Sequence, residues 1–409
     1  MSEFDPIDTE IVDFAVREHR SLWLDAWHRL IASKTAMLGL FVVVLFILTA
    51  GLSHYFWKYD PKSDLDYSSK LLAPSLFVTE DSPVIHIFGT DKLGRDNFRR
   101  VVHGGWNSLR VGLVAVSISL SIGGLMGLLA GFFESIDMNY WEKVTLMGLL
   151  VLGLGSLSAW IAAQTFQIFL FSGLGIFSVV FQRWKAGKKI RLLAFSILGM
   201  LLGGVPGLLV GPMVALVCGI LGLVVGLILA RPLGGKLFSD VTMRIMDVIL
   251  SFPSYLLAIA IVAFLGPGLE KGMIAIGVVG IPIYARLARS AVLSVSQKEY
   301  VLAAQAVGES HGRVLFKHIV PNILSPIIVQ STMGLANAIL SAAALGFLGL
   351  GAIPPEPEWG AMLGDSYKYL SSGAWWAVLF PGLAIMLSVL GFNLLGDGLR
   401  DALDPKMRI

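Results

Sequence analysis

Long uncharged stretches of apolar residues alternate along the chain with shorter segments that hold most of its charged residues. A helix needs about 20 apolar residues to cross the roughly 30 Å hydrocarbon core of a bilayer. Runs of about this length or more occupy residues 35–57, 111–133, 248–269, 272–293, 319–351 and 369–396. Because these runs are apolar on all sides, they predict membrane-spanning helices and not the alternating strands of a β-barrel.

Two further uncharged runs, 144–182 and 192–230, are each about 39 residues long, so each fits a helical hairpin better than a single span. The link between them, 183–191, has five basic and no acidic residues, which predicts a cytoplasmic position by the positive-inside rule. The chain then has about ten spans. An even number of crossings and a basic C-terminal tail predict that both termini are cytoplasmic.

The overall composition narrows the class of protein. Of the 409 residues 56% are hydrophobic and only 14% are charged, with a mean hydropathy of +0.76. Since a soluble domain has about 25% charged residues, a water-soluble enzyme is excluded. The net charge of +3 is too small to indicate a nucleic-acid partner, and the one cysteine, Cys218, has no disulfide partner within the chain.

The residue pattern contains no recognisable catalytic motif. The phosphate-binding motif G-x-x-x-x-G-K-[ST] is absent, and neither paired cysteines nor the H-E-x-x-H motif occurs. The charged residues Asp247, Glu270, Arg286 and Asp397 fall near the predicted span ends, which disfavours a carrier driven by an ion gradient. We therefore predict a non-catalytic chain with no cofactor and no metal site.

Small residues recur at every fourth position in two of the apolar segments. Gly123, Gly127 and Gly131 form the first set, and the second set runs from Gly203 to Gly219. This spacing puts the small residues on one face of a helix and predicts a close approach between helices.

One charged segment between two predicted spans, residues 299–321, has the pattern of a short helix. Tyr300, Ala303, Ala304 and Val307 have the spacing of the apolar face of a helix. Gly308 is placed like a C-terminal cap, and Pro321 begins the next span. Basic residues such as Arg313 and Lys317 predict that the segment is cytoplasmic, so the helix is interpreted as a docking element. A helix lying on the membrane surface is the alternative from the pattern alone.

The same segment resembles the EAA loop of permease subunits in binding-protein-dependent ABC importers. The resemblance rests on Ala303-Ala304, Gly308 and His318-Ile319-Val320-Pro321. It implies a coupling helix seated in a groove of a cytoplasmic ATPase, with the docking residues Glu299, Tyr300, Ala303, Ala304, Val307, Gly308, Arg313, Lys317 and Pro321. Leu302 stands where the motif has its leading glutamate, and Glu299 lies three positions earlier.

Other stretches resemble the dipeptide/oligopeptide (DppC/OppC) branch of these permeases, and they are 88–96, 243–247, 347–351, 355–360 and 392–405. The resemblance implies an all-α, polytopic membrane protein with the six-span core of a type I ABC importer permease. Residues 134–237 form an apolar insertion with about four extra transmembrane helices, for which we recognise no counterpart.

The predicted division of the chain is a cytoplasmic leader (1–34), two spans with a periplasmic loop (35–133), the insertion (134–237) and the remaining permease core (238–409). The resemblance implies a subunit of an ATP-driven importer of peptides or a related small solute in a bacterial cytoplasmic (inner) membrane. Its implied partners are a sister permease, two ATPase subunits, an extracytoplasmic solute-binding protein and the lipid bilayer. A stand-alone secondary carrier and a structural membrane scaffold are the alternative functions.

Overall fold

The computed structural model describes residues 22–56, 59–60, 64–77, 85–136 and 235–403, and no strand is present among them. The helices are α1 (Leu22–Ala32), α2 (Lys34–Phe56), α3 (Asn97–Ser119), α4 (Leu125–Ser135), α9 (Gly235–Ser251), α10 (Ser254–Leu265), α11 (Leu269–Ser296), α12 (Glu299–Ala306), α13 (His311–Arg313), α14 (Val320–Phe347), α15 (Trp359–Ser366) and α16 (Trp376–Leu403). Two π-helical turns, Leu120–Gly124 and Val314–Ile319, join α3 to α4 and α13 to α14.

Five continuous helices of the described residues are long and apolar enough to cross a membrane, and the bent pair α9 and α10 makes a sixth candidate. They correspond to the six spans predicted outside the insertion, so an all-helical, multi-span membrane protein is confirmed. The predicted spans between 137 and 234, and the second glycine set, lie outside the described residues.

The second predicted span, 111–133, is the inner part of a helix that begins much earlier. The side chain of Asp96 caps this helix by accepting a hydrogen bond from the Arg99 N–H at 3.0 Å. Polar residues in its first turns, including Arg100 and His103, are buried. The helix therefore begins before the predicted span, because polar residues in its first turns are covered by other parts of the same chain.

The predicted span 248–269 is also not one straight helix. It breaks at Phe252-Pro253, where α9 and α10 meet at 88°. Proline cannot donate a helical hydrogen bond and disfavours helical geometry in the residue before it, so α9 ends at Ser251.

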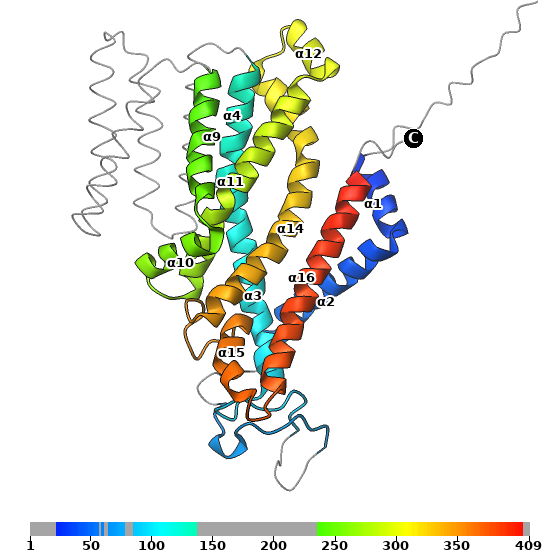
Figure 1. The fold of residues 1–409 in the computed structure, drawn as a ribbon. Coiled ribbons are helices and arrows are strands. Elements are labelled where there is room, and N and C mark those ends of the chain that lie inside the picture. The colour runs from blue at the N-terminus through cyan, green and yellow to red at the C-terminus, as the bar shows by residue number, and fades with distance from the viewer. Residues whose placement is uncertain (1–21, 57–58, 61–63, 78–84, 137–234, 404–409) are drawn as a thin grey trace, which may run out of the picture.

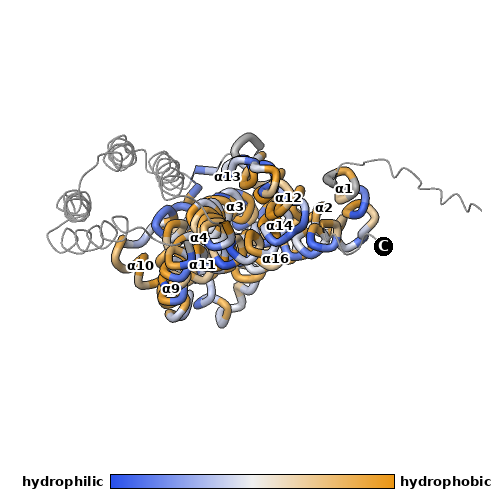
Figure 2. The backbone as a smooth tube through the Cα atoms, turned by 90° about the horizontal axis from the view of Figure 1, so that it is seen from above, coloured by the Kyte–Doolittle hydropathy of each residue, from blue (hydrophilic) through white to orange (hydrophobic). Residues whose placement is uncertain are grey.

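The helices form an elongated bundle with two distinct ends (Figure 1). We call the end that holds α12 the inner end and the end that holds α15 the outer end. Seen along the bundle, α9 and α10 lie at one edge and α1 and α2 at the opposite edge (Figure 2). Between them α4, α11, α3, α14 and α16 pack side by side.

The centre of the bundle is the contact between α11 and the helix formed by α3 and α4. A Cβ atom at Gly123 would lie 2.2 Å from the carbonyl oxygen of Ile281, and one at Gly127 would lie 2.1 Å from that of Ala285. Both distances are too short for a real side chain. The close approach predicted from the glycine spacing is confirmed, and α11 is the helix that these glycines contact.

The α11 helix contributes small residues to the same contact. A Cβ atom at Gly277 would lie 2.8 Å from the Ile118 Cβ, and one at Gly280 would lie 2.3 Å from the Ser119 hydroxyl. That hydroxyl is 2.7 Å from the Gly277 carbonyl oxygen, so a buried polar contact accompanies the packing.

The two described chain ends meet at the inner end. Ala26 and Leu30 of α1 form a buried cluster with Ala36 and Ala402. The outward face of α1 exposes Leu24, Trp27 and Ile31, spaced three and four residues apart. This amphipathic pattern is typical of a helix that lies at a membrane surface.

An ion pair at the inner end holds together the residues on either side of the 137–234 segment. Glu134, near the end of α4, accepts hydrogen bonds from Arg289 at 2.7 Å and from the Ser239 hydroxyl at 2.6 Å. Ser239 lies in the second turn of α9. The chain therefore leaves the described bundle and returns to it at the same end.

We expect Gly127→Ala to destabilise the protein by about 1–3 kcal/mol, because its methyl group overlaps the Ala285 carbonyl. The measurement is the thermal unfolding midpoint of the purified protein in detergent. Gly272→Ala is the matched control, since a Cβ there meets nothing within 4 Å. Alanine favours helix over glycine by about 1 kcal/mol, so the control should be neutral or stabilising. Equal midpoints for both variants would contradict the packing role of Gly127.

Candidate functional site

The predicted docking segment contains the short helix α12, which is anchored at the inner end of the bundle. Val301 and Ala304 face inward, and Val301 is fully buried. Val301 belongs to a core cluster with Phe132 of α4 and Val292 of α11, so the position of α12 depends on the central helices.

Most of the exposed surface of α12 is apolar. Tyr300, Ala303 and Val307 are exposed with the spacing of one helix face, and Val307 has 85% of its surface accessible. Leu302 extends this surface and is 52% exposed. Three of the four residues predicted to share an apolar face do so, but Ala304 lies on the buried side. We call Tyr300, Leu302, Ala303 and Val307 the docking face.

The α12 helix ends at Ala306, and Gly308 lies in its C-terminal cap, as predicted. Gly308 has a φ of +79°, and its N–H donates to the Gln305 carbonyl at 2.9 Å. The Glu309 N–H donates to the Ala304 carbonyl at 3.1 Å. This left-handed conformation favours glycine, because residues with a Cβ atom adopt it only at a cost in conformational free energy. A Cβ at Gly308 would meet nothing within 4 Å, so backbone geometry alone sets the preference.

A group of charged side chains follows the cap and is centred on Glu309. Its carboxylate lies 2.8 Å from His318 Nε2, 3.8 Å from Arg313 Nε and 4.0 Å from Lys317 Nζ. The side chains of Arg313 and Lys317 are about two-thirds exposed, whereas Glu309 is largely covered. The predicted basic residues Arg313 and Lys317 therefore lie around the Glu309 carboxylate. The other predicted acidic residue, Glu299, is exposed in the first turn of α12.

The predicted start of the next span, Pro321, lies within a helix that already begins at His311. Proline has no N–H and crowds the preceding turn, and the turn before it, Val314–Ile319, is π-helical. The Asn322 side chain donates to the His318 carbonyl at 2.7 Å. Leu315 and Ile319 of this π-helical turn are buried and belong to the same core cluster as Val301.

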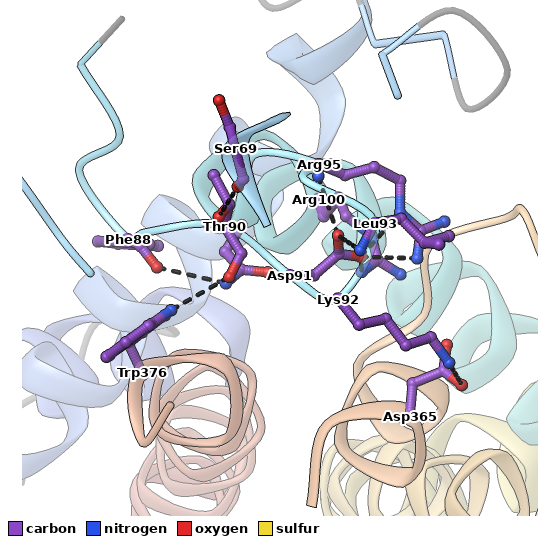
Figure 3. A network of polar contacts seen from close by, with 11 residues as sticks. Ser69, Phe88, Thr90, Asp91, Lys92, Leu93, Arg95, Arg100, Asp365 and Trp376 are labelled. Atoms are coloured by element: carbon purple, nitrogen blue, oxygen red, sulfur yellow. Dashed lines mark hydrogen bonds and ion pairs between the residues drawn. The ribbon is translucent and has the colours of Figure 1, made fainter. Parts of the chain in front are cut away.

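The outer end has a second polar cluster, built on residues 88–96. Figure 3 shows the Asp91 carboxylate between the guanidinium groups of Arg95 and Arg100, at 2.7 Å and 2.5 Å. The Asp91 carboxylate also accepts the backbone N–H groups of Leu93 and Arg95, each at 2.9 Å. The three charged side chains are at most 4% exposed, so this is a buried ion cluster.

The same segment fastens the outer loop to two helices distant in sequence. The Trp376 indole donates to the Thr90 carbonyl at 3.1 Å, and Lys92 pairs with Asp365 at 2.8 Å (Figure 3). Thr90 also accepts the Leu72 backbone N–H at 2.8 Å. Residues 88–96 therefore stabilise the outer end by joining the loop to α15 and α16.

A buried carboxylate begins α15. Glu358 is 1% exposed and accepts the N–H groups of Gly360 and Ala361, each at 2.8 Å. Burial raises the pKa of the Glu358 carboxyl, although these two hydrogen bonds act in the opposite direction. The neighbouring Trp359 indole donates to the Val101 carbonyl at 2.8 Å, which ties α15 to α3.

Comparison with known proteins identifies the family. Residues 222–409 match the family "Binding-protein-dependent transport system inner membrane component", and residues 21–74 match the N-terminal TM domain of oligopeptide transport permease C. The dipeptide transport system permease protein DppC of Alkalihalophilus pseudofirmus is 38% identical over 388 residues, 95% of this chain and 91% of that protein. The chain belongs to this permease family.

Two further relatives extend the comparison. The di/tripeptide transport system permease protein DppC of Pseudomonas aeruginosa is 35% identical to this permease over 93% of the chain and 91% of the relative. The probable D,D-dipeptide transport system permease protein DdpC of Escherichia coli is 46% identical over 89% of the chain and 85% of the relative. The resemblance drawn from the sequence motifs is confirmed.

Sequence reasoning located the short helix α12 of the permease but missed the residues that hold it. Glu309, the centre of the charged group, was not among the predicted site residues. Val301 was not singled out, although its position three residues before Ala304 fits a buried helix face. Within the described part of the permease no group of three or more His, Cys, Asp or Glu residues is arranged to hold a metal ion.

We expect Asp91→Asn to destabilise the permease by about 3–5 kcal/mol, because it leaves two buried guanidinium groups without their carboxylate. Lys92→Ala is the control, since it removes a neighbouring ion pair whose side chains are 32% exposed. That loss should cost at most about 1 kcal/mol. Thermal unfolding in detergent measures both variants, and a smaller loss for Asp91→Asn than for Lys92→Ala would refute the assignment.

Proposed function

We propose that this permease is the transmembrane subunit of an ATP-driven importer for peptides, such as dipeptides and oligopeptides, or a related small solute. Peptide substrates are supported by the names of its relatives, which are dipeptide, di/tripeptide and D,D-dipeptide transport permeases. The observation that carries the mechanism is the docking face of α12. An apolar face that the described fold leaves uncovered fits a protein partner that supplies the energy.

The partners in this proposal are a sister permease, two cytoplasmic ATPase subunits and an extracytoplasmic solute-binding protein. The sister permease and this chain form the translocation path together, and each binds one ATPase at its inner end. The permease has no catalytic role in this scheme, because ATP hydrolysis takes place on the ATPase subunits. Movement of α12 transmits the nucleotide state to the spans through Val301 and its core contacts.

The proposed orientation places the inner end in the cytoplasm of a bacterial cell, with both chain termini on that side of the cytoplasmic membrane. Two contacts at one end of the bundle support this orientation. The α1 helix packs against the end of α16. The Ser325 hydroxyl, near the start of α14, donates to the Leu403 carbonyl at 3.5 Å. The outer loop, with α15, then faces the solute-binding protein. Neither a stand-alone carrier nor a scaffold is favoured by the family membership.

We expect Val307→Asp to reduce co-purification of the ATPase subunits at least tenfold, because a carboxylate in an apolar contact must be desolvated without a partner. Gln297→Asp is the control, since it adds the same charge at an exposed position just before α12. ATPase content is measured on complexes purified from membranes in mild detergent. Full recovery of ATPase with Val307→Asp would exclude the docking face as the contact.

We expect Gly308→Leu to block ATP-dependent dipeptide uptake while the permease still inserts into the membrane. The substitution forces a branched side chain into a left-handed backbone conformation and so distorts the end of α12. Gly312→Leu is the control, because a Cβ there also meets nothing within 4 Å but its φ is not in the left-handed region. Gly308→Asn should retain part of the uptake, since asparagine tolerates this conformation. Wild-type uptake by Gly308→Leu would disprove the coupling role.

A further inference from the structure

One face of α9 is polar along the length of the helix, although α9 is part of a candidate span. Its exposed polar side chains are spaced four, four, three and four residues apart, and they are Lys236, Asp240, Arg244, Asp247 and Ser251. With 3.6 residues per turn, these five positions fall within a sector of about 80°. We call this set the polar stripe.

The rest of the exposed surface of α9 differs from the polar stripe. Ile245 and Val248 are 47% and 62% exposed and lie beside the stripe on the same helix. The buried side, with Met246, packs on α11 at Ile281 and Ala285. The helix thus has one side against protein, one apolar side suited to lipid, and one charged side.

The charges extend into two candidate spans. Asp247 pairs with Arg286 of α11 at 2.5 Å, and their side chains are 45% and 51% exposed. Arg286 lies ten residues before Ser296 at the inner end of α11, which corresponds to about 15 Å along the helix. Asp247 and Arg286 each lie ten or more residues from either end of their candidate spans, Lys236–Leu265 and Leu269–Ser296.

A second feature marks the outer end of the polar stripe as unsuited to lipid. The α9 helix breaks just after Ser251, and α10 begins after Pro253 without a side chain that caps its first N–H groups. Such groups lack partners within the helix. Irregular backbone and ion pairs at membrane depth occur only where they are buried in protein or line a water-filled cavity.

We propose that the polar stripe and Arg286 line a water-filled path through the importer and bind the two charged ends of a peptide in transit. This rests on the proposed function as a peptide permease. The charges of the stripe alternate in sign from Lys236 to Asp247. Arg244 is therefore followed by Asp247 about one helix turn later. A guanidinium group binds the peptide carboxylate, and an aspartate carboxylate binds the peptide ammonium.

The Asp247 and Arg286 pair fits this role because each charge has a partner when no peptide is present. A peptide that carries both a carboxylate and an ammonium can replace this pairing with two equivalent pairings, so no charge is left uncompensated during transfer. Ser290 and Ser294 are exposed on α11 between Arg286 and its inner end, and they continue the polar lining toward the cytoplasm.

The test uses thiol accessibility in the assembled importer, reconstituted in proteoliposomes. The chain has one cysteine, so Cys218→Ser provides a background without thiols. In that background we introduce Asp247→Cys or Ser251→Cys in the polar stripe, and Ile245→Cys or Val248→Cys on the apolar side as controls at similar depth. The reagent is a charged, water-soluble methanethiosulfonate, which reacts only with thiols in contact with water.

The stripe cysteines should react at least tenfold faster than the control cysteines, and a dipeptide added with ATP should slow their reaction severalfold. Ser251→Cys removes no charge, so it keeps the test valid if Asp247→Cys fails to assemble. Stripe cysteines as unreactive as the controls would overturn the proposal and indicate that protein covers the stripe. Dipeptide uptake by the Cys218→Ser background is measured separately, and its absence would count against the proposed function itself.

A charge exchange separates peptide binding from a purely structural ion pair. Asp247→Arg combined with Arg286→Asp retains the pair with its order reversed, and we expect normal assembly but at least a tenfold loss of dipeptide uptake. Each single charge-reversal variant, Asp247→Arg or Arg286→Asp, should also lose dipeptide uptake. Wild-type uptake by the double variant would show that the pair serves only to hold α9 against α11, and it would overturn the binding role.

Discussion

The close contact between α11 and the helix formed by α3 and α4 is the constraint on which the other parts of the permease depend. At Gly123 and Gly127 the backbones are so close that no side chain fits between them and the carbonyl oxygens of α11. In a bilayer such contacts replace the hydrophobic effect as the source of helix association, because lipid tails are as apolar as the helices. The position of α11 then determines both its inner end, where α12 begins, and the level of Arg286.

The two ends of the bundle are stabilised by different interactions. At the outer end, buried charges hold the loop to α3 and the Trp376 indole N–H holds it to α16, so the contacts are directional and tolerate little change. At the inner end, α12 is held by a few apolar residues such as Val301, and its other face is uncovered. An element with few restraints on one side can change position without unfolding its neighbours, as a coupling element requires.

The sequence predicted the number of spans outside the insertion, the glycine contact and the extent of α12, because each depends on local periodicity. It did not predict the early start of α3 at Asn97, since the polar residues there are buried by tertiary contacts, Arg100 against Asp91 and His103 against Tyr59. Ala304 was placed on the wrong face because a four-residue pattern cannot tell which side of a short helix meets the bundle. The pairing of Asp247 with Arg286 was not predicted, because it depends on how α9 packs against α11.

The hydrogen bonds that join Glu134, Ser239 and Arg289 also bear on how the permease tolerates its 137–234 segment. They bring together the two points where that segment leaves and rejoins the bundle. The entropy of closing a loop grows only with the logarithm of its length, and here the described residues already hold the loop closed. A segment of very different length between these two points would therefore change the stability of the described core little.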